Sequence, residues 1–310
     1  DYYRRKGTDL IALQMLPLET GFMSTYVNWA SMRNDGFEVA LTTRNINRNG
    51  FTWFTNFNLG YNQNKVLRET VPSNQTTPGR EGYPVGALFA YKSAGLDDEG
   101  YPLFYNKEGE KVTAVELLKL NSAGASTLSA EEQRNLYSYI GSSDPLFSGG
   151  FVNTFNIKRF EVVVNFIFNL KMYSRVAPSY TLTSFDRGMN TNRDILNRWT
   201  PTNTDFPALL SDTKRTAEYS HYDIFSTYQM MDTWVKRSDH VRLQNIRVGY
   251  KLPETLMHTL GIRSATVALE GRNLFVFGAN YKNFLDPETM SNQFAQPIPK
   301  SFTFSLNMNF

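Results

Sequence analysis

Long runs in which apolar and polar residues alternate are the feature of this sequence that most restricts its fold. In the last ten residues the apolar positions are Phe302, Phe304, Leu306, Met308 and Phe310, and each position between them is Thr, Ser or Asn. A period of two is typical of a β-strand, because successive side chains point to opposite faces. One face of this strand is therefore wholly apolar, and the other is polar and uncharged.

The same alternation recurs in residues 51–61 and 162–170, each with one face of aromatic and aliphatic side chains. Both runs reach the roughly 9 to 11 residues that a β-strand needs to cross a bilayer. A strand of a soluble β-sandwich alternates in the same way over a shorter length. The run length and the aromatic residues at the run ends therefore favour membrane strands over sandwich strands.

Composition excludes several other kinds of protein. The chain has 310 residues, of which 14% are aromatic, yet its mean hydropathy is only −0.40. No stretch approaches the roughly 18 consecutive apolar residues of a membrane helix. The absence of cysteine removes disulfides, thiolate catalysis and thiolate metal sites. The net charge of +3 comes from scattered basic residues, so no basic run is present to follow a nucleic-acid backbone.

Alternating segments predict about eight crossing strands. They lie near residues 1–15, 27–46, 51–64, 146–156, 160–171, 238–250, 264–276 and 301–310.

The predicted connections between these strands fall into two groups. Short connections follow the second, fourth and sixth strands, and Asn49-Gly50 in the first of them is a hairpin signal because both residues tolerate positive φ. The other connections are longer, and those at 65–145 and 172–237 are very long. Barrels of bacterial outer membranes have this asymmetry, with tight turns on the periplasmic side and large loops outside.

The long loops are expected to carry structure of their own. Ser129-Ala130-Glu131-Glu132 is a capping-box pattern that predicts a short helix running towards Tyr139, and a second helix is expected over 115–120. Exposed loop aromatics can stack on sugar rings or seat a partner protein, although packing of the loops against one another is the more ordinary role for any single ring. The loop aromatics are Tyr83, Tyr91, Tyr101, Phe104, Tyr105, Trp199, Tyr219, Tyr222 and Trp234.

Several short motifs follow one another along the chain, namely residues 1–11 (DYYRRKGTDLI), 34–38 (NDGFE), 149–155 (GGFVNTF), 197–201 (NRWTP), 241–246 (VRLQNI) with Leu252-Pro253, 271–275 (GRNLF), 286–288 (DPE) and 299–302 (PKSF). In this order they resemble the SusC-like family of TonB-dependent transporters. Each motif is weak alone, but together they span nearly the whole chain. The Asp239-His240 pair departs from the usual family pattern, in which Gly precedes an aromatic residue or Ser.

The resemblance implies an all-β fold, namely an antiparallel transmembrane β-barrel section of about eight strands within a 22-stranded barrel, with long extracellular loops that contain short helices. Residues 1–310 are then the C-terminal part of the barrel, and the plug domain, the TonB-contacting region and the N-terminal strands lie outside this sequence. The implied activity is import of an oligosaccharide or peptide across the outer membrane, without catalysis or a cofactor. The implied partners are a SusD-like lipoprotein lid, the TonB complex, outer-membrane lipid and the barrel-assembly machinery.

Candidate contact residues lie on the polar face of the strands and in the loops. Polar groups there keep a channel wet and can hydrogen-bond sugars or peptides, although contact with the plug alone is the alternative role. The candidates for substrate binding are Asn56, Asn58, Asn165, Asn169, Glu270 and Arg272 on strands, and Trp199, Tyr222 and Trp234 in loops. By the same parity Glu161 and Lys171 also point inward. Phe310 is expected to act as the assembly signal, since an aromatic residue ends the last apolar strand.

The sequence offers little for catalysis or metal binding. The three histidines are far apart and show no zinc-binding spacing. A pairing of Ser238 with His240 is conceivable, but a solvated strand entrance is the preferred interpretation. Asp97-Asp98-Glu99 is oxygen-rich without the spacing of a calcium loop, which indicates a turn.

Two alternatives remain open at this stage. The first is a secreted all-β carbohydrate-binding or glycan-cleaving protein, which, unlike a membrane barrel, stays soluble without detergent. The second is a self-contained eight-stranded barrel, which is disfavoured because the chain starts inside a family-like strand.

Overall fold

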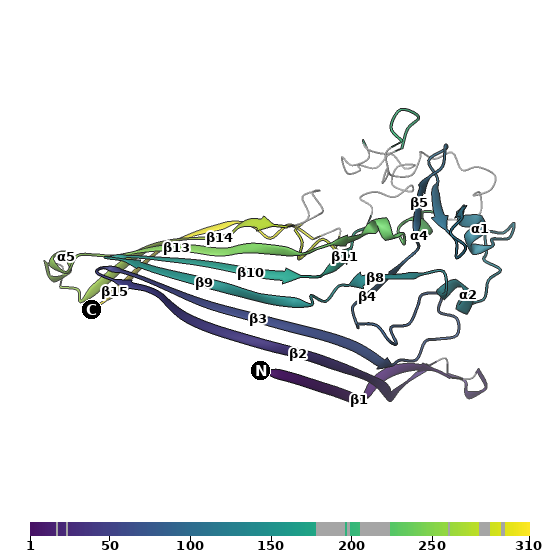
Figure 1. Cartoon of the computed structure of the whole chain (residues 1–310), viewed down its shortest axis with the longest axis horizontal. Helices are drawn as coiled ribbons and strands as arrows, with labels where there is room; N and C mark the ends of the chain where they lie inside the picture. Colours follow the sequence, from purple (N-terminus) through teal and green to yellow (C-terminus); the bar gives the residue numbers. More distant parts are fainter. Residues whose placement is uncertain are drawn as a thin grey trace.

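A computed structural model describes residues 1–16, 18–22, 24–177, 196, 199–204, 224–259, 261–278, 286–292 and 295–310. Long strands run along one part of the molecule, and the short strands and most of the helices gather at one end, with a single helix at the other end (Figure 1). No helix in these described ranges is both long and apolar enough to cross a membrane.

One antiparallel sheet of eight strands forms the larger part of the structure. In spatial order the strands are β1 (Tyr2–Met15), β2 (Ser24–Arg48), β3 (Phe51–Arg68), β9 (Phe147–Ile157), β10 (Phe160–Leu170), β13 (His240–Lys251), β14 (Ser264–Phe277) and β15 (Ser301–Asn309). All the predicted strands are present and pair in chain order. The sheet is open, with β1 and β15 as its edges, so the self-contained closed barrel is wrong.

The strands β2 and β3 are longer than predicted. β3 continues to Arg68, where the prediction ended at residue 64, and β2 begins at Ser24. The added residues of β3 pair with predicted residues of β2, such as Lys65 opposite Arg33, and the added start of β2 pairs with β1, such as Thr25 opposite Gln14. An extension without an apolar face gives no alternation signal, because the signal needs one face to avoid water.

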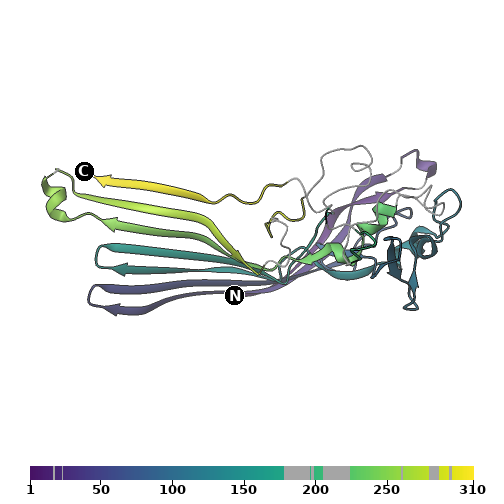
Figure 2. The same ribbon diagram turned by 90° about the horizontal axis from the view of Figure 1, so that it is seen from above.

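Short connections lie at one end of the sheet and long ones at the other (Figures 1 and 2). Gly50 has a φ of 77° in the β2–β3 turn and Lys158 a φ of 54° in the β9–β10 turn, as tight hairpins require. The connection from β13 to β14 contains α5 (Glu254–Thr259), a helix that was not predicted. The sequence did not indicate this helix, because six residues make fewer than two helical turns and are too few to show a repeat of apolar residues.

One face of the sheet, here called the apolar face, is mostly apolar and carries one uncharged polar row, Thr43, Thr55 and Asn153. Its central row runs from β2 to β14 through Leu41, Phe57, Phe151, Phe166, Leu243 and Phe275. Aromatic rows flank it: Phe37, Tyr61 and Phe147 stack towards the long-loop end, and Phe160 and Tyr250 lie against each other near the turns. Between these rows the registers place no Asp, Glu, Lys or Arg on this face of the described strands.

The height of the apolar face matches a membrane. Tyr61 and Phe51 lie in the two flanking rows of β3, ten residues apart. At roughly 3.3 Å per residue this is about 33 Å along the strand, and a tilt of about 40° reduces it to about 25 Å. That is the height of the apolar band on outer-membrane barrels, and aromatic girdles flank such a band. Because the registers place no charged residue between the two aromatic rows, they confirm the prediction of a charge-free middle of the strands.

Residues of the long connections form a second, smaller body. Its sheets pair β4 (Ala87–Ala90) with β8 (Ser138–Ser142), join β5 (Ser93–Leu96), β6 (Pro102–Tyr105) and β7 (Lys111–Val112), and pair β11 (Tyr173–Arg175) with β12 (Val235–Arg237). Its helices are α1 (Ala114–Leu118), α2 (Ala130–Arg134), α4 (Ile224–Tyr228) and the 3-10 turn η4 (Asp232–Trp234), and a further 3-10 turn, η1 (Leu18–Thr20), lies between β1 and β2.

Helix starts in this smaller body follow local sequence rules. Ser129 caps α2 in a complete capping box with Glu132, as predicted, and Thr113 with Glu116 does the same for α1. The hydrogen bond from Ser129 lowers the pKa of Glu132. However, α2 ends at Arg134 instead of running towards Tyr139, because Ser138–Ser142 pairs with β4 as a strand.

Candidate functional site

The face of the sheet opposite the apolar face, here called the polar face, carries the predicted strand contacts. Strand register places Asn56, Asn58, Asn165, Asn169, Glu270 and Arg272 together on it. Asn56, Asn165 and Arg272 lie in one row across the sheet, joined through the residues they pair with. Hydrogen-bonding amides and charges thus line a continuous strip rather than separate spots.

Two ion pairs lie on the polar face. Arg247 on β13 lies 2.6 Å from Glu161 on β10, and Arg272 lies 2.6 Å from Glu270 on β14. Asn245 donates to Glu270 at 3.3 Å, while its own side-chain oxygen is buried without a hydrogen-bond partner in the described part of the chain. An unused acceptor on this face is available to a ligand or a neighbouring domain.

Lys171 lies just beyond the end of β10 with a φ of 53°, and its ammonium group lies 5.7 Å from the centre of the Phe147 ring. It also lines a hollow at the loop end together with Asn62 and Asn64 of β3. The inward parity of Lys171 therefore stays a prediction.

A buried charged cluster fastens a returning loop to the outer end of β13. Arg242 is 1% exposed and bonds Asp286, and its Nε lies 2.7 Å from Glu288. The His240 ring places Nε2 3.3 Å from Glu288 and Nδ1 2.9 Å from the backbone oxygen of Ser238. One guanidinium group and one imidazole ring thus face two carboxylates, which holds residues 286–288 against the polar face.

The Ser238 hydroxyl is engaged away from His240. It lies 3.2 Å from the hydroxyl of Ser174, and both residues are buried. Asp239 accepts from the backbone of Met172 at 2.8 Å and pairs with Arg237, whose pKa it raises. The three neighbours serve three separate contacts and form no catalytic relay, but Ser238 and His240 are almost fully buried, so the expected solvated strand entrance is wrong.

An open hollow lies where β3, β8 and β11 meet at the loop end of the sheet. It has a volume of about 490 Å³ and is lined by Asn62, Asn64, Tyr139, Asp144 and Tyr173 among others. Asp144 accepts hydrogen bonds from the Asn64 amide at 3.1 Å and from the backbone of Gly86 at 3.2 Å. Burial raises the pKa of the Tyr139 hydroxyl. Aromatic rings beside amides and a carboxylate suit a polyhydroxylated or amide-bearing ligand.

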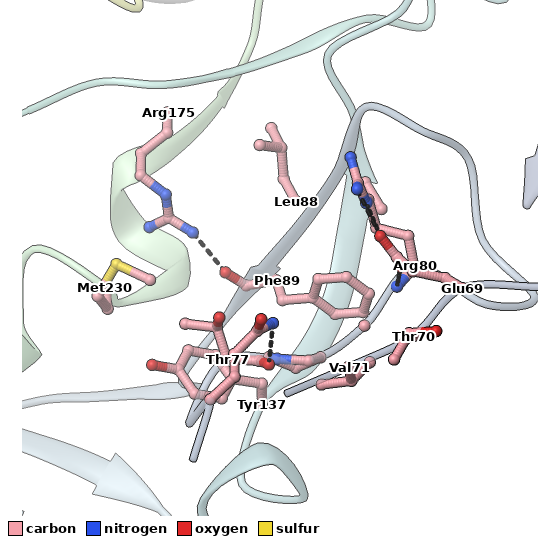
Figure 3. Close-up of a pocket in the computed structure, with 14 residues that line it drawn as sticks. Glu69, Thr70, Val71, Thr77, Arg80, Leu88, Phe89, Tyr137, Arg175 and Met230 are labelled. Atoms are coloured by element: carbon pink, nitrogen blue, oxygen red, sulfur yellow. Dashed lines mark hydrogen bonds and ion pairs between the residues drawn. The ribbon is translucent and has the colours of Figure 1, made fainter. Parts of the chain in front are cut away.

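A second hollow lies deeper in the loops and is shown in Figure 3. It has a volume of about 330 Å³ and is lined by residues of the segment after β3, of β4 and of β11. The Glu69 carboxylate pairs with Arg80 at its rim, and the Arg175 guanidinium donates to the backbone oxygen of Phe89 (Figure 3). This hollow is called the Arg175 pocket below.

The predicted loop aromatics have different surroundings. Trp234 is 5% exposed and packs with Tyr91, Phe104 and Tyr228 in the core of the smaller body, so its ring supports the loops. Trp199 is half-buried. Tyr219 and Tyr222 lie outside the described residues, and Phe310 is 74% exposed at the end of the sheet.

Sequence reasoning missed the Arg242 cluster and the Arg175 pocket. Arg242 and Asp286–Glu288 were noticed only as separate family motifs, and nothing in their spacing links a strand to a loop more than forty residues away. Arg175 carries no motif at all. The oxygen-rich segment did form a turn as predicted, since Asp97 accepts from the backbones of Glu99 and Tyr101.

Known proteins provide an independent comparison. No protein-family model matches the chain. Over its whole length the chain is 28% identical to TonB-dependent receptor P3 of Formosa agariphila, of which it covers 32%, and 22% identical to TonB-dependent receptor SusC of Bacteroides thetaiotaomicron, of which it covers 29%. The chain therefore spans about a third of the length of the curated relatives it matches.

Solved structures agree on the fold. A structure of the RagAB peptide importer in an "open-open" state superposes with a TM-score of 0.73 and 22% identity, covering 100% of this chain and 32% of that chain. A structure of the RagAB peptide transporter gives a TM-score of 0.71 at 22% identity, covering 100% and 33%. The all-β, eight-stranded barrel section expected from the sequence is thereby confirmed.

Proposed function

Because this chain is homologous over its whole length to SusC/RagA-type TonB-dependent receptors, we propose that it forms the C-terminal part of the barrel of an outer-membrane importer. The observation that carries the proposal is the two-faced sheet. A charge-free apolar face about 25 Å high suits contact with lipid, and the opposite face lines a polar passage. The open edges β1 and β15 then pair with strands of the same receptor outside this sequence.

The proposed activity is TonB-driven import of a bulky nutrient, either an oligosaccharide or a peptide, without a chemical step. The amides and ion pairs of the polar face, including Asn56, Asn165 and Glu270, supply hydrogen bonds of the kind that both substrate classes make. The RagAB structures are those of a peptide importer, which gives the peptide reading a structural precedent. The oligosaccharide reading is supported by the amide and aromatic lining of the hollow around Asn62.

The proposed partners follow from the same topology. A SusD-like lipoprotein lid would cover the long-loop end, and the TonB complex would act on a plug domain that lies outside this sequence. Phe310, which is 74% exposed at the end of β15, is proposed as the signal for the barrel-assembly machinery. The strand it ends has a free edge in this chain, to which another strand can add.

The proposal is tested in cells that produce the full-length protein. Deletion of its gene should abolish growth on one class of polymer, glycan or protein digest, as sole carbon source, and the intact gene should restore that growth. A copy lacking its TonB-contacting segment is the matched control, and it should insert normally but restore nothing. Recovery of the protein from the soluble fraction without detergent, or full restoration by the TonB-deficient copy, would contradict the proposal.

A further inference from the structure

The Arg175 pocket has an uneven charge. Of the described side chains that line it, one is a carboxylate, Glu69, and two are guanidinium groups, Arg80 and Arg175. Glu69 is fully engaged by Arg80, which donates to it from Nε at 2.9 Å and from its backbone nitrogen at 2.6 Å. The pair is neutral, so the lining keeps one net positive charge, and Arg175 carries it.

In the described part of the chain, backbone carbonyl groups and not a carboxylate bind the Arg175 guanidinium group. It donates to the backbone oxygens of Phe89 and Gln229, the latter at 3.1 Å, and no carboxylate in the described part of the chain pairs with it. These bonds use only part of the five N–H donors of a guanidinium group. Burial lowers the pKa of Arg175, with a smaller opposite effect from Tyr137. The group stays charged in proteins, so the pocket holds a partly desolvated cation that an anion would stabilise.

The rest of the lining is mixed, with polar Thr70, Gln75 and Thr77 beside apolar and aromatic side chains. Among the latter, Leu88 and Phe89 come from β4, and Tyr137 and Met230 come from other loop segments (Figure 3). Such side chains pack against a ring or a compact hydrocarbon body. A volume of about 330 Å³ has room for one amino-acid residue or one monosaccharide unit, not for a long chain.

We propose that the Arg175 pocket is a subsite for one carboxylate-bearing unit of the imported substrate, with the carboxylate on the Arg175 guanidinium and the body of the unit against Phe89 and Tyr137. The shared chemistry is a carboxylate attached to a compact ring or side chain. Its source is either the C-terminal residue of a peptide or a uronic acid of an oligosaccharide. This inference rests on the proposed function, because it makes the pocket part of the path of the substrate.

The test uses the full-length protein purified in detergent and titrated calorimetrically with two pairs of probes. N-acetylphenylalanine is compared with its uncharged amide, and methyl galacturonoside with methyl galactoside. In at least one pair the acid should bind tenfold or more tightly than its neutral twin, since a hydrogen bond between charged groups is lost in the twin. The pair that shows the preference identifies the source of the carboxylate.

Variants then assign the preference to the pocket. Arg175→Gln should reduce the acid-over-neutral ratio to about one, while Arg175→Lys should keep part of it because the charge remains. Arg68→Gln is the matched control, since Arg68 also donates to a backbone oxygen, that of Trp29 at 2.9 Å, and neither residue lines the pocket. Heat-modifiable migration on gels reports the barrel fold of each variant, and resistance of the long connections to added protease reports the fold around the pocket.

Three results would overturn the inference: no binding of either acid to the folded wild-type protein, equal binding of acid and neutral twin, or a preference that survives in folded Arg175→Gln. The wild-type comparison needs no variant, so a misfolded variant leaves the test decisive. Failure here is distinguishable from failure of the proposed function, because TonB-dependent growth on the substrate polymer is measured separately and can persist without this subsite.

Discussion

The eight-stranded sheet and the smaller body formed by the long connections, here called the loop body, differ in where their apolar side chains lie. On the sheet, large apolar side chains are exposed, with Phe302 and Phe304 at 72% and 70%. In the loop body, Phe104, Tyr228 and Met231 are 0% exposed and pack in one cluster. The loop body therefore buries its own core as soluble proteins do, whereas the sheet leaves its apolar face for another medium to cover.

This difference indicates which solvent stabilises each region. Contiguous apolar surface of this extent is unfavourable in water but neutral against lipid tails. The loop body contains the short strands and all the described α-helices except α5, and water tolerates them because exposed backbone groups can bond to it. Changes in the two regions should consequently have separate consequences, and the following substitutions test that separation.

The largest effect is expected from emptying the core of the loop body. Phe104→Ala should destabilise it by about 3–5 kcal/mol, because the removed ring leaves a cavity among packed side chains. Loops on intact cells should then be cut faster by added protease, while the amount of inserted barrel stays normal. Phe22→Ala is the control, since Phe22 is 71% exposed and its loss leaves no cavity. Loss of insertion in Phe104→Ala would show that the two regions are not separable.

The next effect concerns the central row of the apolar face. Leu41→Arg should reduce the heat-modifiable, membrane-inserted fraction, because Arg near the bilayer midplane costs about 2–4 kcal/mol. Thr42→Arg is the matched control, since Thr42 is the next residue of the same strand and lies on the polar face opposite Asn56. Equal losses in the two variants would mean that the two faces of β2 meet the same medium.

The smallest effect is expected where the loops are fastened to the sheet. Glu288→Gln removes a charge that contacts Arg242 and His240, at a cost of about 1 kcal/mol, because Glu288 is partly exposed and solvent screens it. Amides of 286–292 should exchange hydrogen faster in the variant, and those of β13 much less. Glu254→Gln on exposed α5 should change neither. Unchanged exchange in 286–292 would remove the cluster as the fastening point.

Most of the sheet followed from the sequence, whereas most of the loop body did not. The strands around Leu41 and Phe57 could be recognised in the sequence, because lipid on one side and water on the other impose a period of two. Capping boxes such as that of Ser129 are also local and were predictable. The short strand β4 and its partner β8 lie far apart in sequence and carry no such period, so their pairing depends on tertiary packing.

The residues of the candidate site also divide into those that the sequence predicted and those that only the folded structure revealed. Asn56, Asn165 and Glu270 fell on the polar face because parity along a strand fixes the face. Contacts such as Arg242 with Asp286, or Arg175 with Phe89, join segments brought together only by folding. Trp234 shows the converse, because an aromatic residue in a loop looks available for ligands until its packing is known.

Cysteine accessibility along β3 tests the two-faced sheet most directly. The chain contains no cysteine, so in full-length protein freed of any other cysteine each single replacement reports one position. Asn56→Cys, Phe57→Cys, Asn58→Cys and Leu59→Cys are labelled in intact membranes with a charged, water-soluble maleimide. Asn56→Cys and Asn58→Cys should react, and Phe57→Cys and Leu59→Cys should react only with a lipid-soluble maleimide. Equal labelling of all four positions by the water-soluble reagent would contradict a sheet with lipid on one face and a polar passage on the other.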